Sequence, residues 1–315
     1  MPAGVDEIVM STKVFVTGAS GFIGQQVVRV LHENGHTVHG ITSAAPKETN
    51  HVDLWHKADL LGNDSIATLI KQEKPDLFIH LAWHVAPGSY AGAENIKWVQ
   101  ATLQLMRDYY DPMGTDGRMV IAGSGFEYDR NYGFCSEEST PMNPDSYYGK
   151  CKNATRELFE AYINENNLSG AWGRIFNVYG PAEAPKRLIS SVIISMLRNQ
   201  RVSCSAGTQY RDYLHVSDVA NALVAVGELP SLNGAINIAS GEPIQIRRLV
   251  EIVASKFTKP PEIGFGDIPS SENDLPFAVA DIRRLTNEVG YTPRYRIEEG
   301  LQQTIDWWTT NLPDE

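Results

Sequence analysis

Residues 13–35, KVFVTGASGFIGQQVVRVLHENG, contain a strand, a glycine loop and a helix in direct succession. KVFVTG is a short β-branched run typical of a buried strand, and the segment from 22 to 35 repeats its apolar residues with helical spacing. Between them, Gly18, Gly21 and Gly24 stand at a G-x-x-G-x-x-G spacing. Glycine is required where a backbone turns tightly, approaches a pyrophosphate or packs a helix closely on a strand. Strand, loop and helix together predict a dinucleotide-binding loop rather than an ordinary turn.

The same alternation continues along the chain. Further strands are predicted at 37–41, 76–82, 118–124 and 170–180, and helices at 65–72, 93–110 and 146–165. Near-continuous apolar strands that alternate with helices indicate an α/β fold, a Rossmann-type doubly wound parallel sheet.

Beyond residue 180 the alternation loosens, which predicts a smaller, interleaved C-terminal substrate lobe. The predicted domains are a dinucleotide-binding domain at 1–178, to which 211–241 returns, and a substrate-binding lobe made of 179–210 and 242–315.

Composition excludes several classes of partner. The formal charge is 27 − 38 = −11, without a basic stripe, so neither nucleic acid nor an anionic membrane surface is an expected partner. No stretch of 18 apolar residues occurs, and the first residues lack the pattern of a signal peptide. The three cysteines have neither metal-ligand nor disulfide spacing. We expect a cytoplasmic protein with no metal site and no membrane partner.

The second predicted strand should end near an adenosine ribose. A carboxylate there would bind the ribose 2′-hydroxyl and repel a 2′-phosphate. The position 24 residues after Gly18 is instead Thr42, followed by Ser43, with Lys47 nearby. This favours NADP(H) as cofactor and leaves NAD(H) as the alternative. Asp59 is a candidate for the adenine amino group, with a solvated loop acid as an equally good reading.

The segment DSYYGKCK (145–152) raises the question of which tyrosine works with which lysine. Residues i and i+4 share a helical face, which pairs Tyr148 with Lys152, whereas Tyr147 reaches Lys150 at i+3. Periodicity alone permits both pairs. A tyrosine has a pKa of about 10, so a neighbouring cation is needed if its phenolate is to act near neutrality.

Four motifs decide between the pairs by resemblance: TGASGFIG, YGKCK, RIFNVYGP and RDYLHVSD. Together they resemble the extended short-chain dehydrogenase/reductase family (NAD-dependent epimerase/dehydratase type), in its sugar-nucleotide branch. The resemblance implies that Tyr148 and Lys152 are the catalytic pair and that Ser124, four residues before Tyr128, hydrogen-bonds the substrate oxygen. It also implies a nucleotide-sugar substrate and a homodimer.

The predicted cofactor site follows from the glycine loop and the resemblance. It consists of Gly18, Ser20, Gly21, Phe22, Ile23, Gly24, Thr42, Ser43, Asp59, Leu60, Leu81, Ala82, Trp83, Tyr148 and Lys152.

The resemblance also bears on the reaction. In the 4,6-dehydratases of the family, the residue at Ser124 is followed by an Asp and a Glu that eliminate water, but this chain has Gly125 and Phe126. Glu127 should point to the other side by strand alternation. Of the reactions of this branch, reduction of a 4-keto group and 4-epimerisation remain as candidates. The absence of a carboxylate at Thr42 favours the reductase, closest to the nucleoside-diphosphate 4-keto-6-deoxyhexose reductases.

On the substrate side, the resemblance assigns Asn177 to a phosphate or the sugar and Arg211 to the diphosphate, and Arg187 stands at a predicted helix start. The family's second arginine is replaced by Ser271, so we expect Arg187 to compensate, or a different substrate. Two alternatives stay open. One is a non-catalytic dinucleotide-sensing protein on the same fold, and the other is a reductase of a small carbonyl compound.

Overall fold

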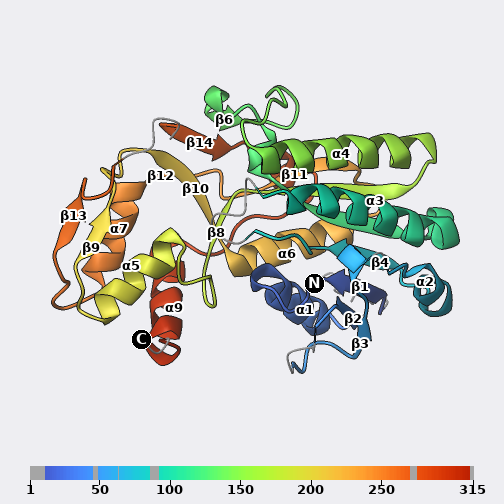
Figure 1. Ribbon diagram of the computed structural model, residues 1–315, viewed down its shortest axis with the longest axis horizontal. Helices are drawn as coiled ribbons and strands as arrows, with labels where there is room; N and C mark the ends of the chain where they lie inside the picture. The colour runs from blue at the N-terminus through green and yellow to red at the C-terminus, as the bar shows by residue number, and fades with distance from the viewer. Residues whose placement is uncertain (1–10, 45–48, 63, 86–91, 270–274, 313–315) are drawn as a thin grey trace, which may run out of the picture.

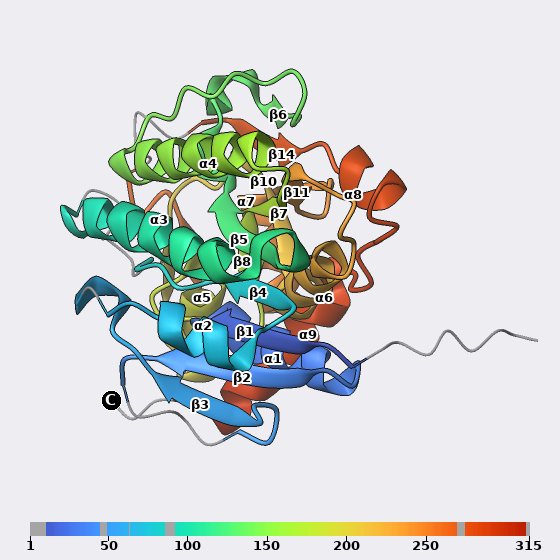
Figure 2. The ribbon, with the colours of Figure 1, turned by 90° about the vertical axis from the view of Figure 1, so that its right-hand side faces the viewer.

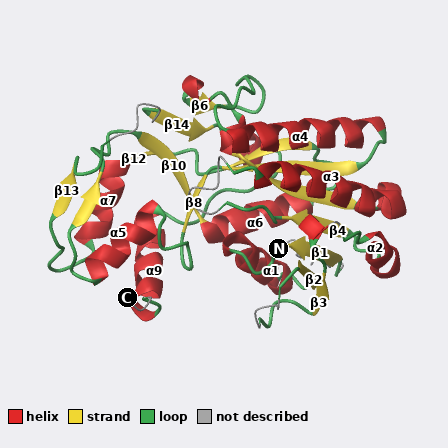
Figure 3. Cartoon of the chain, viewed as in Figure 1, coloured by secondary structure: helices red, strands yellow, loops and turns green. Residues whose placement is uncertain are grey.

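The computed structural model describes residues 11–44, 49–62, 64–85, 92–269 and 275–312. Figure 1 shows a large unit, in which helices flank a sheet, and a smaller lobe that contains α5, α7 and α9. Coloured by secondary structure in Figure 3, strands β9 and β13 lie beside those lobe helices.

The large unit is built on a seven-stranded, fully parallel sheet in the order β11-β7-β5-β4-β1-β2-β3. Its strands are β1 (Lys13–Thr17), β2 (Thr37–Thr42), β3 (Leu54–Lys57), β4 (Leu77–His80), β5 (Arg118–Ser124), β7 (Ser169–Ile175) and β11 (Gly234–Ile238). The strand order reverses direction between β1 and β4. In doubly wound sheets, ligands bind in the crevice outside the carboxyl ends of the strands at this point.

Helices cover both faces of this sheet (Figure 2). They are α1 (Phe22–Glu33), α2 (Ala67–Glu73), α3 (Glu94–Met113), α4 (Tyr147–Glu165) and α6 (Val216–Gly227). Successive side chains of β1 alternate between the faces, because Val14 and Val16 pack with α1 and α6 whereas Phe15 packs with α2, α3 and α4. The predicted Rossmann-type doubly wound sheet is confirmed.

A second sheet connects the two parts of the molecule. It contains β6 (Phe134–Cys135), β8 (Asn177–Tyr179), β10 (Tyr210–His215), β12 (Pro243–Gln245) and β14 (Phe277–Ala280). The lobe adds α5 (Leu188–Leu197), β9 (Val202–Cys204), α7 (Ile246–Ser255), β13 (Ile263–Phe265) and α9 (Ile297–Thr310), whose apolar faces form a separate core. The short helix α8 (Arg283–Asn287) packs beside β11.

Three features differ from the sequence expectation. The strand predicted at 170–180 is divided at Phe176 into β7 of the large sheet and β8 of the second sheet. Strand β3 was not predicted, because this edge strand is only partly buried and LWHK lacks a continuous apolar run. Within 211–241, α6 and β11 pack with the large sheet, as expected, but β10 belongs to the second sheet. The predicted domain boundaries stay a prediction.

Candidate active site

The loop after β1 has the shape that its glycines predict. Gly18 has a φ of +69°, and a Cβ there would lie 2.9 Å from the backbone nitrogen of Ala82, at the end of β4. A Cβ on Gly24 would collide with the carbonyl oxygen of Gly18. Helix α1 starts after Gly21 with no side-chain cap and no acidic residue in its first turn. Its first N–H groups therefore suit a phosphate, and Ser20, Phe22 and Ile23 lie partly exposed around them.

The end of β2 carries hydroxyl groups. Thr42 is its last residue, and its Oγ1 accepts a hydrogen bond from the N–H of Ala44 at 3.2 Å. Ser43 is exposed. Lys47 lies outside the described residues. Asp59 is exposed and accepts from the N–H of Leu61 in the 3-10 turn η1 (Leu60–Gly62).

A buried polar chain lies beneath the crevice between β1 and β4. Nδ1 of His80 is 2.7 Å from Oγ1 of Thr17, and Nε2 is 3.0 Å from Oγ1 of Thr102. Burial, with a smaller effect of the Lys152 charge, lowers the pKa of His80 to about 3. A neutral histidine therefore links β1, β4 and α3, directly below the predicted cofactor residues Leu81 and Ala82.

The two neighbouring tyrosines at the start of α4 have opposite environments. Ser146 caps this helix, accepting a hydrogen bond from the N–H of Gly149 at 3.1 Å. Tyr148 is 6% exposed, whereas Tyr147 is 42% exposed. The Tyr148 ring packs edge-on against Trp83 and Phe126, with centroid distances of 6.3 and 6.1 Å.

Lys152 lies on the same face of α4 as Tyr148, because Trp83 contacts both. Its Nζ is 3.8 Å from the centre of the Trp83 ring and donates a hydrogen bond to the carbonyl oxygen of Ala122 at 2.8 Å. Burial lowers the pKa of Lys152 to about 7, and the negative charge of Glu127 opposes this shift. An anionic phenolate at Tyr148 would favour the charged form of this lysine.

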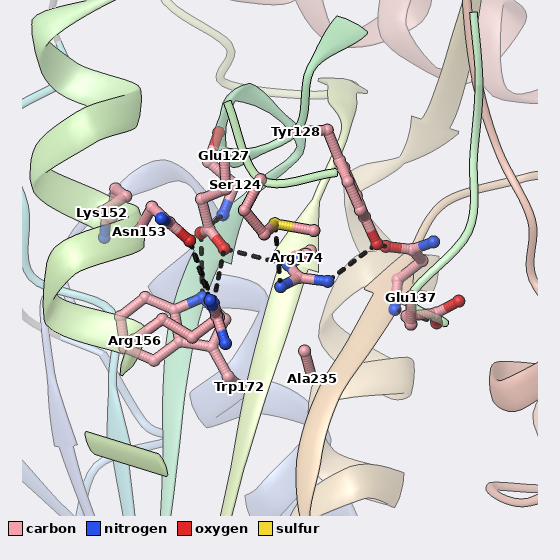
Figure 4. Close-up of polar contacts among 12 residues, drawn as sticks. Ser124, Glu127, Tyr128, Glu137, Lys152, Asn153, Arg156, Trp172, Arg174 and Ala235 are labelled. Atoms are coloured by element: carbon pink, nitrogen blue, oxygen red, sulfur yellow. Dashed lines mark hydrogen bonds and ion pairs between the residues drawn. The ribbon is translucent and has the colours of Figure 1, made fainter. Parts of the chain in front are cut away.

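Ser124 ends β5, and its main chain is anchored by Glu127 (Figure 4). The carboxylate of Glu127 accepts hydrogen bonds from the N–H of Ser124 at 2.6 Å and from Nε1 of Trp172 at 2.9 Å. Its other oxygen accepts from Nε of Arg174 at 3.0 Å. Glu127 has no exposed side-chain surface. Gly125–Glu127 form the 3-10 turn η4, so these hydrogen bonds, and not the expected strand alternation, orient its carboxylate.

The network continues beyond Arg174. Nη1 of Arg174 donates to the hydroxyl of Tyr128 at 2.8 Å, and this hydroxyl donates to Asn237 on β11 at 2.8 Å. Burial is the main cause that raises the pKa of Tyr128. A continuous chain of hydrogen bonds thus joins three strands of the large sheet behind the predicted serine.

A pocket of about 200 Å³ opens on the other side of Phe126. It is lined by Gly125, Phe126, Arg130, Phe176, Asn177, Arg211 and Ala278. Asn177 is oriented by a hydrogen bond to the carbonyl oxygen of Asp212 at 2.9 Å, and Arg211 by one to that of Tyr210 at 2.8 Å. Because Phe126 contacts Tyr148, this pocket adjoins the predicted catalytic tyrosine.

The other predicted arginine lies elsewhere. Arg187 precedes α5, and its Nη2 donates to the carbonyl oxygen of Val85 at 2.7 Å. It is not among the described residues that line the pocket. Ser271 lies outside the described residues. Arg130 was missed, because it belongs to none of the four motifs and only the folded chain brings it to the pocket.

Comparison with known proteins now assigns the family. The model of the NAD dependent epimerase/dehydratase family matches residues 14–239. The chain belongs to this family. The predicted resemblance is therefore confirmed at the level of the family.

The chain is similar over almost its whole length to individual members. It is 27% identical to a dTDP-glucose 4,6-dehydratase of Xanthomonas campestris pv. campestris, with 94% of this chain and 93% of the relative covered. It is 28% identical to a putative UDP-glucose 4-epimerase of Methanocaldococcus jannaschii, with 95% and 99% covered. The solved structure of MoeE5 in complex with UDP-glucuronic acid and NAD is similar with a TM-score of 0.82 and 29% identity, covering 95% and 99%.

Two negative findings concern the described part of the chain. None of its helices has the length and hydropathy needed to cross a membrane. Its His, Cys, Asp and Glu side chains form no cluster of three or more that is placed to hold a metal ion. All three cysteines are buried and unpaired, and burial raises the pKa of each thiol.

Proposed function

We propose that the protein is an NAD(P)-dependent oxidoreductase that acts on C4 of a nucleotide sugar, with Ser124, Tyr148 and Lys152 as its catalytic residues. The finer proposal is NADPH-dependent reduction of the 4-keto group of a nucleoside-diphosphate 4-keto-6-deoxy sugar. The homodimeric state implied by the resemblance and the cytoplasmic location expected from the sequence belong to this proposal.

One observation carries it. Tyr148 is buried between Trp83 and Phe126, beside Lys152, and Phe126 also lines the pocket that contains Asn177 and Arg211. A proton donor, its cation and two polar substrate ligands are thereby assembled at the carboxyl ends of the parallel strands. The cradle at Gly18 and Gly24 and the uncapped start of α1 fit a dinucleotide diphosphate.

When bound, the nicotinamide cofactor supplies the hydride that C4 receives. Ser124 would donate a hydrogen bond to the carbonyl oxygen and hold it in place. As negative charge develops on this oxygen, Tyr148 would transfer its phenolic proton to it, leaving a secondary alcohol. Lys152 would stabilise the phenolate that remains, since a cation beside a phenol favours its ionised form.

The pocket argues against water elimination, the reaction of the dehydratase relative. Gly125 and Phe126, in the positions of the eliminating acid and base, bear no proton-transferring group. Glu127 is committed to Ser124 N, Trp172 and Arg174 on the other side of the strand.

A second candidate is 4-epimerisation with bound NAD. It is favoured by the epimerase relative and by NAD in the MoeE5 complex. The same three side chains would serve both reactions, because Tyr148 can accept a proton in one direction and donate it in the other. The preference for reduction rests on Thr42 and Ser43, where no carboxylate would repel a 2′-phosphate. The intact Ser124, Tyr148 and Lys152 argue against a non-catalytic dinucleotide sensor.

The test is a screen of nucleoside-diphosphate 4-keto-6-deoxyhexoses with NADPH or NADH, followed by absorbance at the wavelength of the reduced nicotinamide. Turnover that is faster with NADPH and abolished by Tyr148→Phe is expected. Interconversion of a nucleoside-diphosphate hexose and its 4-epimer without added cofactor would replace the reductase by the epimerase. Binding of dinucleotide with no turnover of any nucleotide sugar would overturn both.

A further inference from the structure

Two arginines, Arg130 and Arg211, line the pocket beside Tyr148. Arg211 belongs to a recognisable motif, whereas Arg130 comes from the 3-10 turn η5 (Arg130–Tyr132), 81 positions earlier in the chain. We propose that Arg130 is the second cation for the substrate's diphosphate and, with Arg211, determines the preference for nucleoside diphosphates. This inference rests on the proposed function.

The second sheet brings the two arginines together around β14. Arg211 on β10 is in register with Ala278 on β14. On its other side, β14 pairs with β6, and the N–H of Val279 donates to the carbonyl oxygen of Gly133, directly after η5. Neighbouring strands lie about 4.8 Å apart, so β10 and β6, on the two sides of β14, are separated by roughly 10 Å, and η5 leads directly into β6. Ala278 between them has only a methyl group, which leaves room for an anion.

The guanidinium of Arg130 is held in place and has a donor to spare. Its carbon lies 4.2 Å from the centre of the Phe126 ring, and Nη2 donates to Asp145 at 2.8 Å. Its Nε is buried and has no hydrogen-bond partner among the described residues. The rest of the Arg130 side chain is 18% exposed and lines the pocket, so its guanidinium can donate to an anionic ligand there.

The partner carboxylate does not cancel the charge of Arg130. The side chain of Asp145 is 52% exposed, whereas that of Arg130 is 18% exposed. Solvent screens an ion pair of this kind, and its contribution is small. Arg174, in contrast, pairs with the fully buried Glu127, which is the arrangement expected of a structural arginine.

Electrostatics favours a second cation in this pocket. A nucleoside diphosphate brings at least two negative charges to a protein whose formal charge is −11, so local arginines have to offset the overall field. Planar guanidinium groups also match the geometry of phosphate oxygens. Phe126 contacts both Arg130 and Tyr148, so a single ring separates the Arg130 guanidinium from the proposed catalytic tyrosine.

The experiment is calorimetric titration of UDP and dTDP into the full-length parent, Arg130→Ala, Arg211→Ala and the double variant. We expect each single variant to weaken binding of the better diphosphate by roughly tenfold. The fold-loss of diphosphate affinity in the double variant should be smaller than the product of the fold-losses in the two single variants, because both guanidinium groups bind the same anion. The affinity for NADPH should not change in any variant. The affinity for the corresponding nucleoside monophosphate should fall much less than the affinity for the diphosphate.

Control variants separate binding from folding. Arg130→Lys keeps a charge and should recover part of the affinity. Asp145→Asn removes the ion pair but keeps the guanidinium, and should bind the diphosphate at least as tightly as the parent. Arg201→Ala removes a surface arginine that pairs with Asp267 in the lobe, and should leave affinity unchanged.

The outcomes distinguish this inference from the proposed function. Unchanged affinity in Arg130→Ala, with a loss in Arg211→Ala, would overturn the role of Arg130 and leave the function standing. A loss with UDP-glucuronic acid but not with UDP or UDP-glucose would reassign Arg130 to a sugar carboxylate and overturn the diphosphate proposal. Failure of the parent to bind any nucleoside diphosphate would overturn the proposed function itself.

Discussion

Arginines lie on both sides of the β5 carboxyl end, in contrasting surroundings. Behind Ser124, the Arg174 side chain is 2% exposed and its partner Glu127 is 0% exposed, and every contact links one part of the protein to another. In the pocket in front, Arg130 is partly exposed, pairs with an acid at the surface and keeps a donor unpaired among the described residues. The two arginines differ most in the burial of their counter-ions, since Glu127 is 0% exposed and Asp145 is 52% exposed. We use this difference to assign Arg174 to a positioning network and Arg130 to the proposed binding site.

The largest expected effect is on the buried side. Glu127→Ala leaves the buried Arg174 without its counter-ion and the N–H of Ser124 without its acceptor, so the free energy of unfolding should fall by about 3–5 kcal/mol. Glu33→Ala, which breaks the surface pair with Arg29, should cost less than about 0.5 kcal/mol. Urea unfolding of both variants measures the difference. Equal losses would remove the contrast between the two regions.

The second prediction compares the buried Tyr148 with its exposed neighbour Tyr147. Tyr148→Phe removes the proton that the substrate oxygen would receive, and turnover should fall on the order of 10²-fold or more. Tyr147→Phe changes an exposed ring and should have little effect. Steady-state kinetics with the best substrate of the screen checks both, and a reversal of the two effects would make Tyr147 and Lys150 the working pair.

Lys152 is a buried cation without the direct carboxylate partner that Arg174 has. Its folded pKa of about 7 lies below the ordinary value of 10.5, so the unfolded chain binds this proton more tightly. The cost to stability therefore grows as pH falls from about 10.5 to 7 and is complete below that range.

Lys152→Met should abolish turnover yet stabilise the protein at pH 7 by on the order of 1–2 kcal/mol, less than the full pKa difference because the contact with Trp83 is lost. The gain should shrink towards pH 10. Arg174→Met should destabilise at every pH in this range, because it removes the nearest counter-ion of the buried Glu127 and leaves only the more distant Arg156. Unfolding curves of the Lys152→Met and Arg174→Met variants at pH 6, 8 and 10 measure these effects. Equal destabilisation of both variants would contradict the expected difference between Lys152 and Arg174.

The smallest expected effect lies at the cofactor end, far from both arginine environments. The parent should bind NADPH more tightly than NADH, and Thr42→Asp should reverse the order by introducing a charge that repels the 2′-phosphate, with a change on the order of tenfold. Thr42→Ser is the matched control. Fluorescence titration with both dinucleotides provides the affinities, and a parent that prefers NADH would favour the epimerase.

Local sequence alone accounts for the frame of the molecule. The apolar runs and helical spacings predict the parallel sheet, because periods of 2 and 3.6 follow directly from backbone geometry. The loop at 18–24 is partly local, since a Cβ on Gly24 would collide with the carbonyl oxygen of Gly18. Gly18 itself meets the backbone of Ala82, which the neighbouring strand brings to it. Strand β3 was not predicted, because an edge strand buries too little surface to require a continuous apolar sequence.

The environment of each side chain was decided by tertiary structure. Periodicity left Tyr147 and Tyr148 equivalent, and the packing of α4 on Trp83 and Phe126 buries only the second. The sequence placed Glu127 away from the substrate, yet its partners Trp172 and Arg174 come from β7, more than 40 positions later. Arg130 and Arg211 line one pocket because β14 pairs with β10 on one side and with the segment after η5 on the other. Charge and hydrogen bonding act through distances in space, which long-range strand pairing sets and local residue order does not.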